Sequence, residues 1–311
     1  MSSSSPRATP AAAGTAAVTA AVWPGLLLAS AGAIAFSGKA IVAKLMYRHG
    51  VDAVQVLFLR MLMAMPLFML LAWWAGRGKP PLSRRDWGTV LLLGFTGYYL
   101  ASFLDFLGLQ YISASLERLI LYLNPTIVLL IGWLAYRRRV TGRQLLALAV
   151  GYAGVALVFG RELSFEGPRV ALGTALVFGS AVSYAVYLVL SGEAVRRLGS
   201  ARLSGLASSV ACVLCIVQFF VLRPVSALQV PEPVLWMSLL NATVCTVAPV
   251  LMVMMAIERI GASMASQVGM IGPMSTLAMG VVILGEPFTP WLAVGTALVL
   301  GGVWLLTRWR T

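Results

Sequence analysis

Ten long apolar runs alternate with short polar segments along the chain. Each run is roughly 20 residues long, the length of helix that crosses a hydrocarbon core of about 30 Å. The runs are solidly apolar rather than alternating, which favours helices over a β-barrel. The sequence therefore predicts an all-α polytopic membrane protein with ten transmembrane helices. These are expected near residues 22–43, 53–74, 88–108, 112–135, 142–160, 170–191, 204–222, 234–256, 262–284 and 289–307.

A shift of 148 residues lays the second half of the chain over the first. Between residues 112 and 157 the shift gives 11 identities, and it keeps proline on proline and glycine on glycine. A constant offset of this kind is harder to obtain by chance than a match between two apolar compositions. The first-half members of the pairs are Ile112, Ala114, Ser115, Pro125, Leu129, Gly132, Thr141, Ala149, Gly154, Val155 and Leu157.

Five spans in each copy is an odd number, so the second copy must be inverted relative to the first. We expect one five-helix repeat over residues 22–160 and a second over 168–307, packed around a shared site at mid-membrane. Residues 1–21 are rich in Ser, Ala, Thr and Pro and are expected to form a disordered cytoplasmic segment. A cleaved signal peptide is the alternative for this end, but the first apolar run is longer than an ordinary signal core.

The composition places the chain in a bilayer. Hydrophobic residues make up 60% and charged residues 11%, with a mean hydropathy of +0.90, which leaves too little polar surface for a soluble protein of 311 residues. The net charge of +13 raises the possibility of nucleic-acid binding, but the placement of Lys and Arg indicates topology instead.

With a cytoplasmic N-terminus, fifteen basic residues fall inside and five outside, which predicts that both termini are cytoplasmic. The inside set is Arg7, Arg77, Lys79, Arg84, Arg85, Arg137, Arg138, Arg139, Arg143, Arg196, Arg197, Arg202, Arg259, Arg308 and Arg310. The outside set is Lys44, Arg48, Arg161, Arg169 and Arg223.

Charged residues inside spans are rare and costly, and here five of them belong to the first repeat: Lys39, Arg60, Asp105, Glu117 and Arg118. On this topology all five lie in the outer third of the membrane, where they could meet in one network. In one interpretation they form ion pairs, or reach the outer interface, and hold four helices together. In the other they line an outward-facing vestibule, where the cations hold a substrate carboxylate or a carboxyl group exchanges a proton. We favour Glu117 over Asp105 for that exchange, because it lies further from the interface.

Helical spacing groups polar residues of the third and fourth spans into stripes. Adjacent Glu117 and Arg118 point about 100° apart, so they cannot serve one pocket equally. The stripes are Tyr98, Ser102 and Asp105; Ser113, Glu117 and Asn124; and Arg118 with Ser115 and Tyr122.

Pro125 and Pro273 occupy equivalent positions in the fourth and ninth spans. Each removes a helical hydrogen bond, and helix breaks at matching positions mark the central site of many transporters. A tolerated packing kink is the alternative. Five tyrosines could line an aromatic cavity, although each could equally be a packing residue: Tyr98, Tyr99, Tyr122, Tyr184 and Tyr187.

Motifs for other chemistry are missing from the sequence. The segment from Gly32 to Lys39 has the wrong spacing for a phosphate loop, so ATP is not expected to drive this chain. Cys212 and Cys215 form C-x-x-C inside an apolar span, where packing is a better interpretation than redox or metal chemistry. We expect no catalytic residues, no metal and no cofactor.

Several motifs resemble the EamA family of the drug/metabolite transporter superfamily, over residues 25 to 307. They are Gln110-Tyr-Ile-Ser-Ala-Ser-Leu, Asn124-Pro125-Thr, Gly285-Glu286-Pro-Phe-Thr289, Phe36-Ser37-Gly38-Lys39 and Leu59-Arg60-Met61. The resemblance implies ten helices in two inverted repeats and transport of small organic solutes across a bacterial inner membrane, often outward. Two departures are Arg137-Arg138, where the family usually carries Gly-Glu, and Lys39 at a position that is usually polar.

These observations predict a secondary transporter that moves small organic metabolites, such as amino acids or related compounds, by alternating access, with proton coupling and facilitated diffusion both open. Its partners would be the small-molecule substrate and membrane lipid, without nucleic acid, and its oligomeric state stays open. The alternatives are an intramembrane enzyme that uses Asp105 and Glu117, and a nontransporting partner or sensor subunit.

Overall fold

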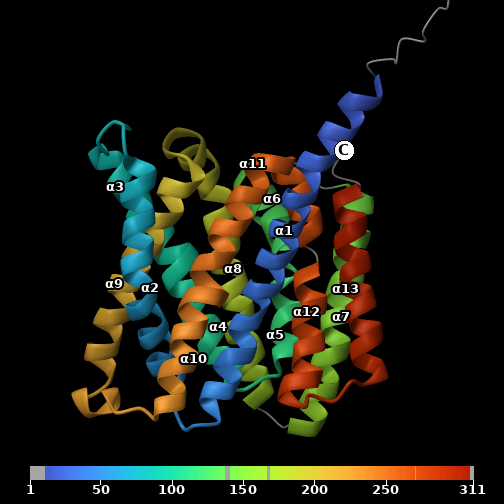
Figure 1. The fold of residues 1–311 in the computed structure, drawn as a ribbon. Coiled ribbons are helices and arrows are strands. Elements are labelled where there is room, and N and C mark those ends of the chain that lie inside the picture. The colour runs from blue at the N-terminus through green and yellow to red at the C-terminus, as the bar shows by residue number, and fades with distance from the viewer. Residues whose placement is uncertain (1–10, 137–140, 167–168, 270, 309–311) are drawn as a thin grey trace, which may run out of the picture.

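Helices make up almost all of the described chain (Figure 1). The computed structural model describes residues 11–136, 141–166, 169–269 and 271–308. The elements of the first half are α1 (Ala11–Tyr47), α2 (Ala53–Gly76), α3 (Arg84–Leu93), η1 (Gly94–Leu100), α4 (Ala101–Leu109), α5 (Ala114–Leu121), α6 (Asn124–Tyr136) and α7 (Gly142–Glu166). Those of the second half are α8 (Arg169–Leu198), α9 (Ser200–Leu222), η2 (Val225–Leu228), α10 (Glu232–Ala242), η3 (Thr243–Val247), α11 (Ala248–Gly269), α12 (Ile271–Met279), η4 (Gly280–Leu284) and α13 (Pro290–Arg308).

The elements combine into membrane-length units that match the expected spans. Within the described ranges, eight units are long and apolar enough to cross a membrane, and two shorter apolar helices cover residues 271–284 and 290–306. The third span is continuous through α3, η1 and α4, and the eighth runs through α10 and η3 into α11. The prediction of an all-α polytopic protein with ten helices in two repeats is confirmed.

One boundary differs from the predicted one. Helix α1 already begins at Ala11, so residues 11–21 are helical where disorder was expected, and residues 1–10 lie outside the described residues. Ala and Thr at these positions permit helix, and the chain then continues directly into the first span. Arg137, Arg138 and Arg139 also lie outside the described residues.

Close helix contacts repeat at the 148-residue offset. A Cβ atom at Gly173 in α8 would lie 2.8 Å from Cγ2 of Ile112, and one at Gly25 in α1 would overlap Cγ2 of Ile260. Gly173 and Ile260 stand 148 residues beyond Gly25 and Ile112, so the two contacts are copies of each other. The π-helical turns η1 and η3 overlap at the same offset. The duplication is therefore present in the packing as well as in the sequence.

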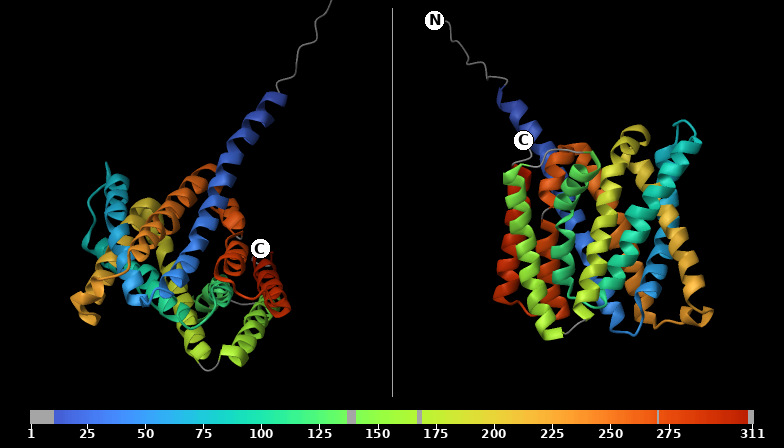
Figure 2. Two further views of the ribbon diagram at one scale, coloured as in Figure 1. Left: turned by 60° about the horizontal axis from the view of Figure 1, so that its bottom comes forward. Right: turned by 180° about the vertical axis from the view of Figure 1, so that it is seen from behind.

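Two pairs of helices occupy opposite edges of the bundle. Figures 1 and 2 show α7 beside α13 at one edge, and α2 beside α9 at the other. Both described ends of the chain, in α1 and α13, lie at one end of the bundle, called here the termini end. The far end carries the connection from α1 to α2.

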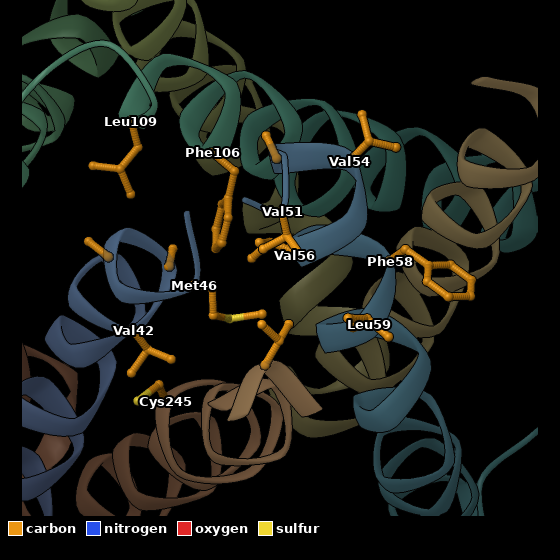
Figure 3. Close-up of a cluster of buried hydrophobic side chains, with 14 of the residues drawn as sticks. Val42, Met46, Val51, Val54, Val56, Phe58, Leu59, Phe106, Leu109 and Cys245 are labelled. Atoms are coloured by element: carbon orange, nitrogen blue, oxygen red, sulfur yellow. The ribbon is translucent and has the colours of Figure 1, made fainter. Parts of the chain in front are cut away.

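Apolar side chains close the far end. A buried cluster, called here the plug, combines the last turns of α1 with the start of α2 and the end of α4 (Figure 3). Met46, Phe106 and Leu109 in it have no exposed surface. The plug comprises Ala40, Ile41, Val42, Ala43, Met46, Val51, Ala53, Val54, Val56, Phe58, Leu59, Phe106, Leu109, Ala114, Phe219, Val234 and Cys245.

A carboxylate of the second repeat clamps a helix of the first at this end. Gly285 has φ of 73°, a left-handed conformation that glycine adopts without strain, and it turns the chain after η4. Glu286 then accepts hydrogen bonds from the backbone N–H of Ala114 at 2.7 Å and from the Ser115 hydroxyl at 2.6 Å. A carboxylate at the start of α5 also complements the helix dipole.

The contact of α7 with α13 should not tolerate a large side chain. A Cβ atom at Gly154 would lie 2.6 Å from the carbonyl oxygen of Gly295, whereas Gly160, on the same helix, has nothing within 4 Å. We expect Gly154→Leu to destabilise the protein by about 1–3 kcal/mol or more, because the helices must separate. Gly160→Leu is the matched control and should leave the Tm unchanged. The measurement is thermal unfolding in detergent, and an equal Tm for the two variants would contradict this packing.

Candidate functional site

A cavity of about 350 Å³ lies among helices of both repeats. Most of the candidate residues from the sequence line it, from α1, α2, η1, α4 and the fourth and ninth spans. They are Lys39, Arg60, Tyr98, Ser102, Asp105, Arg118, Tyr122, Asn124 and Pro273. Glu117 and Pro125 are not among its lining residues. The structure thus brings together side chains that are separated by up to 234 positions in the chain.

An ion pair joins the first and third spans at the cavity wall. Nζ of Lys39 lies 2.7 Å from Oδ2 of Asp105, and both side chains are almost fully buried. The ammonium also lies 5.2 Å from the ring centroid of Phe36 and 5.9 Å from that of Phe106. Lys39 therefore pairs inside the bundle and does not extend to the interface. Oδ1 of Asp105 has no hydrogen-bond partner among the described residues.

The adjacent residues Glu117 and Arg118 divide between two environments. Arg118 lines the cavity, whereas Glu117 is fully buried beside it. Their closest charged atoms are 3.8 Å apart, and neither carboxylate oxygen of Glu117 has a hydrogen-bond partner in the described chain. Glu117 is nevertheless close enough to Asp105 and Lys39 to interact with their charges. The residue favoured for proton exchange is thus next to the cavity wall and not part of it.

Arg60 carries a charge that the rest of the site does not balance. It lines the cavity with 5% of its surface exposed, and its guanidinium lies 4.8 Å from the ring centroid of Phe106. Its Nε and Nη1 atoms are buried without a hydrogen-bond partner among the described residues.

The fourth span is broken beside the cavity. Helix α5 ends at Leu121 and α6 begins at Asn124. Leu121 and Asn124 line the cavity at this break, and Gly269 and Gly272 of the ninth span line it as well. Such breaks bring backbone carbonyl and amide groups to a site that side chains alone would leave less polar.

Tyrosines cover one side of the cavity. Tyr98, Tyr122 and Tyr184 line it, whereas Tyr99 and Tyr187 do not. Tyr187 contacts two of the lining tyrosines: its hydroxyl oxygen lies 3.2 Å from that of Tyr98, and its ring stacks on Tyr184 with the ring centroids 5.5 Å apart. Only part of the tyrosine set therefore contacts the cavity.

Several lining residues were not among the sequence candidates. Ser37 donates a hydrogen bond to the carbonyl of Gly272 at 2.7 Å, which joins α1 to the start of α12 in the ninth span. Thr246 lies in the π-helical turn η3, and Phe36 and Phe68 add aromatic surface. The sequence could have indicated Ser37, because it lies close to Lys39 in the motif Phe36-Ser37-Gly38-Lys39. Single aromatic and hydroxyl residues in apolar spans carry no such signal.

The structure closes the far end of the bundle, where the sequence predicted a vestibule in the outer third of the membrane. Lys39 is followed by plug residue Ala40, Arg60 is preceded by plug residue Leu59, and Asp105 is followed by plug residue Phe106. The charged residues therefore rest on the plug, which separates them from the far end. In this conformation the expected vestibule at that end is closed, because the apolar turns beyond each charge pack against one another.

Comparison with known proteins agrees with this architecture. The family model of the EamA-like transporter family matches residues 23–160 and 171–308. The uncharacterized transporter YcbK of Bacillus subtilis (strain 168) is 30% identical over 270 residues, covering 82% of this chain and 83% of the relative. An uncharacterized transporter of Archaeoglobus fulgidus is 25% identical and covers 82% of this chain and 88% of its own length.

A solved crystal structure shares the fold. It superposes with a TM-score of 0.61 at 17% identity, covering 92% of this chain and 96% of the other. The two regions that the family model matches, residues 23–160 and 171–308, supply the residues that line the cavity. On the two family matches and the identity to curated relatives, the chain belongs to the EamA-like transporter family and is a multi-pass membrane protein.

Proposed function

We propose that this protein is a secondary transporter that moves small organic metabolites by alternating access, with the cavity as its substrate site. The observation that carries the proposal is a cavity between two inverted repeats, lined by buried charged and aromatic side chains and by the break in the fourth span, and closed at one end by the plug. Such a site can serve both sides of a membrane if the repeats rock about it. The relatives' names as transporters support a transport role over an enzyme.

The location follows from the charge distribution. The excess of Lys and Arg in the connections at the termini end supports cytoplasmic termini in a bacterial inner membrane. On that orientation the plug and the Glu286 clamp close the periplasmic end. The cavity would then exchange with the cytoplasm in this conformation.

Proton coupling is part of the proposal, with Glu117 as the exchanging group. Asp105 is already paired with Lys39, whereas both oxygens of Glu117 lack hydrogen-bond partners in the described structure. A buried carboxylate without hydrogen bonds is costly, so a change in its protonation alters the balance of the charges around it. Its neighbours Asp105, Arg118 and Lys39 connect it to the cavity wall.

The transport activity can be tested in proteoliposomes. A mixed radiolabelled panel of amino acids and other metabolites is presented with and without an imposed pH gradient. We expect gradient-driven accumulation of at least one solute by the native protein, and its loss in Glu117→Gln. Glu193→Gln, at an exposed glutamate of α8, is the matched control and should behave as native. Equal accumulation by Glu117→Gln would refute the coupling role, and absence of flux for every solute would refute the transport function.

Variants of the Lys39–Asp105 pair distinguish a structural role of this ion pair from a role in transport. Lys39→Met leaves a buried, unpaired carboxylate and should destabilise the protein by about 3–5 kcal/mol. Adding Asp105→Leu removes that carboxylate, so we expect the double variant to recover most of its Tm in detergent while transport stays low. Full recovery of transport by the double variant would show that the pair serves packing alone.

A further inference from the structure

The charges around the cavity do not sum to zero. Three cations, Lys39, Arg60 and Arg118, face two carboxylates, Asp105 and Glu117, within the described structure. With all five groups ionised the set carries one positive charge. A proton on Glu117 would raise that charge further, so the surplus stays positive in either state.

The surplus is localised on Arg60. Lys39 is neutralised by Asp105 at 2.7 Å, and Arg118 lies 3.8 Å from Glu117. Arg60 takes part in no ion pair in the described chain. Besides Asp105, the titratable groups that act on it are the thiols of the free cysteines Cys212, Cys215 and Cys245, which are poor counter-ions.

Arg118, the other arginine at the cavity, also has buried nitrogens without a hydrogen-bond partner in the described chain, but a carboxylate oxygen of Glu117 lies 3.8 Å from its Nε. Three described arginines away from the cavity have acceptors. Arg223 pairs with Asp52, Arg197 pairs with Asp86, and Arg202 donates twice to the carbonyl oxygen of Pro80. Arg60 is more deeply buried than these, takes part in no ion pair in the described chain, and lies against the face of the Phe106 ring. An unpaired guanidinium in an apolar bundle is strongly unfavourable, so a bound anion would remove a large penalty.

The remaining lining limits the shape of such an anion. Phe36, Phe68, Tyr98, Tyr122 and Tyr184 contribute aromatic surface to the wall. A volume of about 350 Å³ is at the small end of the range for ligand sites, which suits a solute of one ring or a short chain. The planar guanidinium can bind a carboxylate through two parallel hydrogen bonds.

We propose that Arg60 binds the carboxylate of the transported solute, and that this solute is a small monoanionic organic acid with an apolar or aromatic body. The proposal rests on the proposed transport function and specifies its substrate class. The one guanidinium without an ion-pair partner, that of Arg60, favours a monoanion over a zwitterion such as an amino acid, whose ammonium group would leave the surplus charge in place.

A matched set of ligands tests the substrate class on the purified protein. The probes are 3-phenylpropionate, its neutral amide, 3-phenylpropylamine and phenylalanine, and binding is measured by isothermal titration calorimetry in detergent. We expect the carboxylate to bind at least about tenfold more tightly than the other three, because a hydrogen-bonded charge pair replaces an uncompensated charge. Equal binding of the amide or of phenylalanine would overturn the proposal, as would failure of the carboxylate to bind.

Variants of Arg60 test whether this residue binds the carboxylate. Arg60→Gln should remove the preference for the carboxylate over the amide, and Arg60→Lys should retain part of it, because the charge remains without the planar fork. Arg85→Gln, at an exposed arginine of α3, is the matched control and should keep the native preference. An unchanged preference in Arg60→Gln would refute the role of Arg60. If a variant does not fold, the comparison of the four ligands on the native protein still tests the proposal.

Transport assays separate this proposal from the one it rests on. If proteoliposomes move neutral or cationic solutes and exclude organic monoanions, the transport function stands and the assignment to Arg60 fails. If the carboxylate binds with the expected preference but no solute is moved, the anion site stands and the transport function fails.

Discussion

Each charged group that leaves water for the interior of a helical bundle loses hydration free energy of several kcal/mol, and this chain buries five such groups in its first repeat. Their positions follow from that penalty. Lys39 and Asp105 compensate each other directly, Glu117 and Arg118 stay side by side, and Arg60 rests against an aromatic ring. The apolar plug beneath them excludes water from one side, which makes the field of each remaining charge stronger inside the cavity. The cavity therefore owes its chemistry to the plug as much as to its own lining.

The repeat relationship determines where this cavity can be. Copies of the same contact, such as Gly25 with Ile260 and Gly173 with Ile112, relate the two halves by inversion. Leu121 and Gly269, which are equivalent at the 148-residue offset, then both line the cavity. All five buried charges at or beside the cavity, however, belong to one half. The second repeat contributes serine, threonine and tyrosine hydroxyl groups and backbone, so the site is symmetric in architecture and asymmetric in charge.

Much of this could be predicted from the sequence, because apolar length, charge placement and the 148-residue offset are properties of the chain itself. The five buried charges also stand out by their rarity. The division between Glu117 and Arg118 could not be assigned, because a spacing of 100° shows that two side chains diverge and does not show which one faces the cavity. Closure of the far end was missed because it belongs to one conformation, in which the residues after Lys39 and Asp105 pack together. Tyr187 was grouped with the lining tyrosines, although its ring supports the wall from behind.

The Glu286 clamp has a consequence for how the conformations of this protein are populated. Its carboxylate holds two backbone N–H groups and a hydroxyl at the start of α5. The duplicated position in the first repeat, 138, carries an arginine, which has donors and no acceptor and cannot make the mirrored set. The two halves therefore differ in the closing contact that this position can make. In the alternating-access cycle proposed above, the state closed by Glu286 would be the harder one to leave, and its opening would be the slower half of the cycle.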